Sequence, residues 1–182
     1  MRLGYLGRRG IFEEVRRIAF DVAFFERGDI TLVDAGIRER GDIILPCGDY
    51  RCLALELFIK LPRLLGGGKL GVDLGTSRNG VAYVWGGRPL LHAVLDWVAV
   101  EEILKNSSSL EVFIGSSPYV DVKRAASLLC REVHLVDEVT ASWSRPWLKR
   151  LYPQLQEDEI DALSFTLHDG VVASMCVSHR NI

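Results

Sequence analysis

The sequence has few cysteines, and they are not arranged for metal binding. They are Cys47, Cys52, Cys130 and Cys176. No two of them have the two intervening residues of the CxxC pattern of a zinc site. This absence excludes the common zinc modules. We therefore expect ordinary thiols, buried or half-exposed, in a reduced protein.

Long apolar runs are also missing. No run reaches the roughly 18 residues of a membrane span, and the first residues do not combine a charged stretch with an apolar one as a secretory signal does. These absences predict a cytoplasmic protein with no membrane partner.

Neither positive nor negative residues are in large excess. The 182 residues include 22 Lys and Arg against 24 Asp and Glu, a formal net charge of −2. Bulk charge therefore gives no sign of a nucleic-acid binder, although a local basic patch can bind phosphate on a mildly acidic protein. Hydrophobic residues make up 48% of the chain, which is typical of a globular domain and enough for a sizeable core.

Three consecutive glycines, Gly66 to Gly68, divide the chain, because such a run does not suit the interior of a helix or strand. We predict a linker there, between a small N-terminal unit (residues 1–65) and a main domain (residues 69–182). In the first unit, apolar residues at helical spacing predict a helix over 11–25. Two short apolar runs predict strands within 29–36 and 42–48, and an almost wholly apolar stretch predicts a buried helix over 52–65. This α-β-β-α unit is expected to pack on the main domain.

The main domain shows a different pattern. Apolar runs with glycine-rich breaks predict a three-stranded antiparallel meander at 69–74, 80–85 and 89–95. Two further strands are expected at 111–116 and 132–138, with helices at 97–106, 119–130 and 157–168. Three antiparallel strands followed by alternating helices and strands predict an α/β fold, in which helices cover both faces of a mixed five-stranded sheet.

Acidic residues stand at the ends of these elements, where open α/β sheets collect their ligand-binding groups. Asp73 ends the first strand of the meander, Asp137 and Glu138 end the strand at 132–138, and four acids crowd residues 157–161. A helix dipole accounts for Glu157 and Glu159 without any function. It does not account for Asp73, because a carboxylate at the end of a buried strand needs a partner.

Divalent cations are the partners that such carboxylates suit. Mg²⁺ and Mn²⁺ prefer carboxylate oxygens, with water and substrate phosphates completing the shell. Asp158 and Asp161 are three residues apart and share a helix face. The pattern therefore predicts a Mg²⁺ or Mn²⁺ site built from acids far apart in the chain.

Three stretches resemble one superfamily. "GVDLGTSRNGVAYV", "LVDEVTAS" and "DEIDALSF" are similar to the motifs of the RNase H-like superfamily. Within it they most resemble the RuvC-type Holliday-junction resolvases and related nucleases that mature ribosomal RNA precursors. The resemblance covers residues 69 to about 170. In the first motif it lies in Asp73, Gly75, Arg78 and Gly80.

The resemblance implies a function and its residues. It implies a nuclease that hydrolyses phosphodiester bonds in branched DNA or structured RNA and acts as a homodimer. Asp73, Glu138 and Asp161 would be metal ligands, with Asp158 as a further catalytic acid. Arg78 would contact the nucleic-acid backbone or be a solvated hairpin charge, and the glycines Gly75 and Gly80 would let the hairpin turn tightly.

The stretch "WSRPWLKR" (residues 143–150) has two interpretations. Aromatic side chains among Lys149, Arg150 and other basic residues suit a nucleic-acid surface. The same stretch suits a loop packed on the core or on the N-terminal unit.

Two functions remain as alternatives to a nuclease. "DLGTS" also resembles the phosphate-binding hairpin of the actin/Hsp70 ATPases and sugar kinases, in which Thr76 would be a nucleotide ligand, although those proteins need two such domains. The other alternative is an RNase H-like fold kept as a non-enzymatic interaction module, whose acids would only solubilise it.

Overall fold

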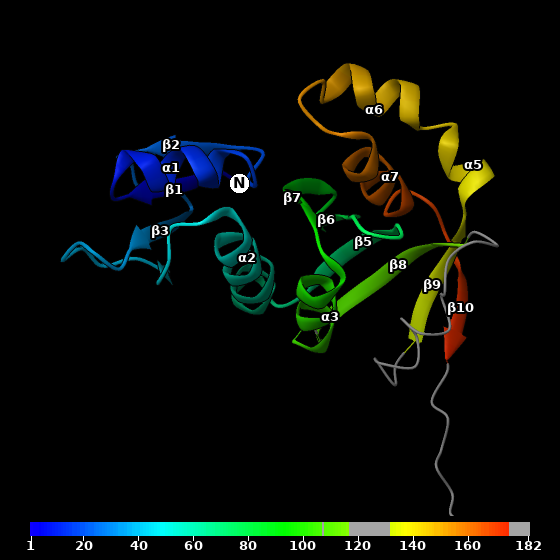
Figure 1. Cartoon of the computed structure of the whole chain (residues 1–182), viewed down its shortest axis with the longest axis horizontal. Helices are drawn as coiled ribbons and strands as arrows, with labels where there is room; N and C mark the ends of the chain where they lie inside the picture. The colour runs from blue at the N-terminus through cyan, green and yellow to red at the C-terminus, as the bar shows by residue number, and fades with distance from the viewer. Residues whose placement is uncertain (107, 117–131, 175–182) are drawn as a thin grey trace, which may run out of the picture.

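The computed structural model describes residues 1–106, 108–116 and 132–174. The chain forms an α/β protein with two sheets, one of four strands and one of six. Figure 1 shows the smaller sheet at the left and the larger at the centre and right. The helix expected at 119–130 lies outside the described residues.

The N-terminal sheet is wholly parallel, in the order β2-β1-β3-β4. Its strands are β1 (Leu3–Leu6), β2 (Val22–Phe24), β3 (Ile30–Asp34) and β4 (Ile43–Leu45), and its helices are α1 (Arg9–Arg16) and α2 (Tyr50–Leu65). The strands β3 and β4 and the helix α2 confirm the sequence prediction.

The helix expected over 11–25 is wrong in its second half, and β1 was not expected. The helix α1 ends at Arg16, and Val22–Phe24 pairs with β1 as a strand. Between them Ala19 forms a bridge with Leu91 in the other sheet. The spacing of apolar residues alone does not distinguish one long helix from a helix followed by a strand. Pairing with β1 makes residues 22–24 a strand, and β1 lies elsewhere in the chain.

A disulfide joins Cys47, just after β4, to Cys52 in the first turn of α2. The expectation of reduced thiols is therefore wrong for this pair. The side chain of Asp49 accepts a hydrogen bond of 3.0 Å from the backbone N–H of Cys52 and caps α2. This capped turn brings the two Cα atoms to 6.2 Å, within the range that a disulfide bridges.

Reducing this disulfide is expected to lower the free energy of unfolding by about 2 kcal/mol, because the loop it closes is short and chain entropy sets the gain. Thermal unfolding of the Cys47→Ser, Cys52→Ser double variant measures the effect. The same midpoint in that variant and in the wild type, both under oxidising conditions, would contradict a stabilising bond.

The second sheet is mixed, in the order β10-β9-β8-β5-β6-β7. The meander is antiparallel, β8 and β9 run parallel to β5, and β10 pairs antiparallel with β9 at the edge. The strands are β5 (Gly68–Leu74), β6 (Asn79–Trp85), β7 (Arg88–Leu95), β8 (Leu110–Ser116), β9 (Glu132–Asp137) and β10 (Val171–Ser174). The predicted mixed sheet is confirmed, but it has a sixth strand, β10, which is too short to show a clear pattern.

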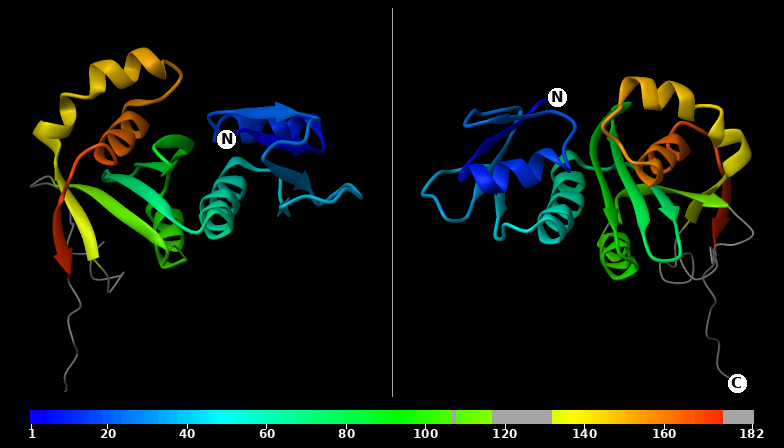
Figure 2. Two further views of the ribbon diagram at one scale, coloured as in Figure 1. Left: turned by 180° about the vertical axis from the view of Figure 1, so that it is seen from behind. Right: turned by 45° about the horizontal axis from the view of Figure 1, so that its top comes forward.

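Helices pack on this sheet from both sides. They are α3 (Trp97–Lys105), α5 (Glu138–Ser142), α6 (Arg145–Leu151) and α7 (Glu157–Phe165). Because side chains alternate along a strand, Leu70 and Val72 of β5 enter the core shared with α2 and α3, whereas Gly71 faces α7. Figures 1 and 2 show α7 against the sheet and α6 outside α7.

The N-terminal unit packs on the larger sheet, as expected. One hydrophobic core contains buried side chains from both, among them Val15 and Leu91. The backbone N–H of His92 donates to the carbonyl of Ile18 at 2.8 Å. The glycine run forms a short connection, in which Gly66 caps α2 with a φ of 74° and β5 begins at Gly68. Among the described helices, none combines the length and the hydropathy that crossing a membrane requires.

Candidate functional site

Three of the predicted metal ligands line one small cavity. Asp73 comes from β5, Glu138 is the first residue of α5, and Asp161 lies on α7. Together with Arg145 and Ser142 they surround a space of about 60 Å³. The fold therefore brings together acids that are up to 88 positions apart in the chain.

Glycines on two strands allow α7 to approach Asp73. A Cβ atom on Gly71 would lie 1.8 Å from the carbonyl oxygen of Ala162, and one on Gly80 would lie 1.9 Å from that of Asp158. Gly80 is also the ladder partner of Asp73. The predicted role of Gly80 in turning the hairpin is therefore wrong, because it lies within β6 and its missing side chain makes room for the backbone of α7.

Glu138 is positioned by its neighbour Asp137. The strand β9 ends at Asp137, whose carboxylate accepts hydrogen bonds from the Val139 backbone N–H at 3.2 Å and from the Thr140 hydroxyl at 2.8 Å. These bonds cap α5 and lower the pKa of Asp137. The helix consequently begins at Glu138, whose side chain lines the cavity.

Arg145 is the site residue that sequence reasoning missed. Two nitrogens of its guanidinium, Nε and Nη2, donate hydrogen bonds to the two carboxylate oxygens of Asp161. The cavity is lined by Glu138, Ala141, Ser142 and Arg145, which recur at helical spacing along residues 138–145. That spacing was the available signal, but the sequence prediction placed no helix between residues 138 and 157.

The carboxylates repel one another in a partly desolvated space. Burial, followed by the charges of Asp161, Asp158 and Glu138, raises the pKa of Asp73 to about 7, against an opposing effect of Arg145. Burial and the charge of Asp161 raise the pKa of Glu138. Burial also raises the pKa of Asp161, although its bonds to Arg145 act in the opposite direction. The cavity thus carries more negative charge than Arg145 compensates.

This donor set fits a hard divalent cation, which prefers carboxylate oxygens and would offset the excess charge. The carboxylates do not crowd a single point, however. Among the described residues, the group of potential ligand atoms lying within 4.8 Å of one another is Cys47, Asp49 and Cys52, and its two sulfur atoms are bonded to each other. The carboxylate of Asp161 is in addition bonded to Arg145.

The remaining predicted site residues lie outside the cavity. The guanidinium of Arg78 is 3.6 Å from the carboxylate of Asp158 and also donates to the side chain of Gln156, which ties the hairpin to the start of α7. Thr76 is exposed in that hairpin. Lys149 pairs with a carboxylate of α7, and Arg150 is exposed on α6.

Glu159 is buried, which the helix-dipole explanation did not anticipate. The residue is 3% exposed, and its Oε1 atom lies 2.8 Å from Nδ1 of His92 on β7, a residue that is 5% exposed. Its Oε2 atom accepts a hydrogen bond of 2.8 Å from the backbone N–H of Gln156. This pair fixes the first turn of α7 on the sheet and so fixes the direction of Asp161.

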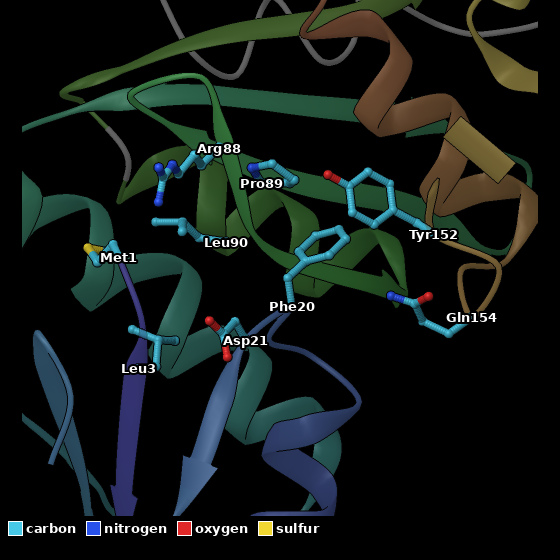
Figure 3. A pocket seen from close by; sticks show the side chains of 9 residues that line it. All are labelled: Met1, Leu3, Phe20, Asp21, Arg88, Pro89, Leu90, Tyr152 and Gln154. Atoms are coloured by element: carbon cyan, nitrogen blue, oxygen red, sulfur yellow. The ribbon is translucent and has the colours of Figure 1, made fainter. Parts of the chain in front are cut away.

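A second cavity, of about 310 Å³, lies where the N-terminal unit meets β7 (Figure 3). Phe20 and Asp21 approach it from one side, and Arg88 and Tyr152 from the other. Asp21 is the one acid among the residues that line it. This cavity therefore lacks the cluster of carboxylates that distinguishes the first.

Comparison with known proteins finds no protein-family model and no curated protein that matches the sequence.

Proposed function

We propose that this protein is a metal-dependent nuclease with an RNase H-like fold, which hydrolyses phosphodiester bonds in branched DNA or structured RNA. The observation that carries the proposal is the cavity that Asp73, Glu138 and Asp161 all line. The order of the elements supports it, since the meander is followed by parallel strands and by a helix that carries the third acid.

In this proposal the three acids hold Mg²⁺ or Mn²⁺. The bound cation would activate a water molecule and stabilise the leaving oxygen of the phosphodiester. Arg145 holds Asp161 before substrate enters, and its guanidinium is the group in the cavity whose geometry suits a phosphate. Asp158 acts from outside the cavity, through its charge on Asp73.

The direct test is cleavage of labelled branched DNA and of structured RNA in the presence of Mg²⁺ or Mn²⁺. Asp73→Asn and Asp161→Asn are expected to abolish cleavage and to weaken Mn²⁺ binding by more than the roughly 10- to 100-fold that the loss of an outer partner costs. Glu111→Gln is the matched control, because Glu111 is an exposed acid on β8.

Cation binding and cleavage that persist unchanged in both aspartate variants would refute the proposal. A wild-type protein that binds nucleic acid without cleaving it would favour the interaction module instead.

A further inference from the structure

Residues 138–151 present an apolar face to solvent. Val139, Trp143, Trp147 and Leu151 recur every four residues, and they are exposed by 70%, 81%, 54% and 49%. We call these four residues the tryptophan surface. Its exposure contradicts the interpretation of this stretch as a loop packed on the core.

The opposite face of the same segment is the wall of the candidate site. Glu138, Ser142 and Arg145 line the cavity, while Leu148 is buried against Ile160 and Leu163 of α7. The diameter of a helix is about 10–12 Å. A ligand on the tryptophan surface would therefore lie about one helix width from the carboxylates.

The charge of α6 is unlike that of the whole chain. Its seven residues include Arg145, Lys149 and Arg150 and no acid, whereas the chain has a net charge of −2. Arg145 and Lys149 pair with Asp161 and Glu157 of α7, so Arg150 is the cation of this helix that we assign to a phosphate. Indole rings next to cationic side chains are the combination that binds single strands, since bases stack on the rings and phosphates meet the cations.

A second copy of the chain is a poorer occupant. With about 250 Å² for each tryptophan, the two indole side chains expose roughly 350 Å². A stable protein interface needs about 800 Å² from each partner.

We infer that the tryptophan surface binds unpaired bases of nucleic acid, so that the substrate has a single-stranded segment beside the bond to be cleaved. The inference rests on the proposed nuclease function and specifies its substrate class. Trp143 and Trp147 stack on the bases, and Arg150 contacts the phosphates beside them.

The test is fluorescence anisotropy of labelled single-stranded oligonucleotides, DNA and RNA, with duplexes of the same sequence for comparison. Chelator is present so that binding is measured without cleavage. Trp143→Ala and Trp147→Ala are each expected to weaken single-strand binding roughly 5- to 150-fold. Trp143→Phe should retain most of the affinity, and Arg150→Gln should reduce the salt dependence by about one phosphate contact.

Val98→Ala is the matched control, because Val98 is an apolar side chain, 63% exposed, on α3. Equal affinity of wild type and both alanine variants for single strands would overturn the inference. So would sedimentation showing that the variants convert a dimer to a monomer while nucleic-acid binding is unchanged, because the surface would then be a protein interface.

The two proposals fail separately. Tryptophan-dependent binding by a wild-type protein that cleaves nothing would refute the nuclease and leave this inference standing. Cleavage that depends on Asp73 but not on Trp143 or Trp147 would refute this inference alone.

Discussion

Gly71→Ala is expected to be among the most destabilising single-methyl changes in this protein. The added Cβ would lie 1.8 Å from the carbonyl oxygen of Ala162, and a backbone atom cannot rotate away as the end of a side chain can. Overpacking typically costs about 1–3 kcal/mol, and we expect the upper end, about 3 kcal/mol. For a chain of this length the midpoint of thermal unfolding would fall by roughly 6–12 °C.

The damage should also reach the cavity, because moving α7 off β5 moves Asp161 away from Asp73. Binding of Mn²⁺ to the folded variant measures this second effect. Gly10→Ala is the control, since a Cβ at Gly10 in α1 meets no atom within 4 Å and alanine favours a helix. A midpoint within about 1 °C of wild type for Gly71→Ala, close to what a neutral surface change gives, would show that α7 does not pack as described.

Asp73→Asn is expected to change stability and function in opposite directions. Without a cation, the folded protein disfavours the charged form of Asp73, whose pKa is raised to about 7. Asparagine removes that penalty, so the cation-free variant should be more stable than wild type near pH 8. Discounted for partial solvent access, the gain is about 2 kcal/mol, or roughly 4–8 °C in the midpoint.

The pH dependence follows from the same shift. Between about pH 4 and pH 7 the folded protein keeps the proton on Asp73 while the unfolded chain releases it, so this group favours folding less as the pH rises. Wild-type stability relative to the variant should therefore decline across that window. Binding of a divalent cation should strengthen across it, because the ligand is the deprotonated carboxylate.

Thermal unfolding and Mn²⁺ titration at pH 5, 6, 7 and 8 measure both trends, with Glu111→Gln as the control. A lower unfolding midpoint for Asp73→Asn than for wild type at pH 8 without cation would mean that Asp73 is stabilised by a partner. In that case the carboxylates do not form a repulsive cluster.

Local patterns predicted the elements that hold the acids. Asp73 lies near the end of a strand that an apolar run predicts, and Asp161 lies on a helix whose buried residues include Ile160 and Leu163. Both patterns are visible from neighbouring residues alone. The helix predicted over 157–168 ends at Phe165, and Leu167 beyond it is 49% exposed. The ends of a helix fray, so its boundaries are predicted less well than its interior.

The parts that the sequence did not predict depend on contacts between distant residues. The pairing of His92 with Glu159 spans 67 positions, so neither residue shows it in its local pattern. The helices α5 and α6 were not predicted. Pro146 stands in the first turn of α6, where proline is tolerated. Recognising that turn would have brought Arg145 onto the same face as Glu138.

The position of β5 has a consequence for the order in which the site is completed during synthesis. This strand pairs with β6 close by in the chain, but its other neighbour, β8, and its covering helix, α7, are translated later. A ribosome-bound chain that stops before residue 161 can build the meander yet leaves Asp73 uncovered. The negative cluster, with its unfavourable repulsion, is therefore assembled only after most of the favourable burial has been gained.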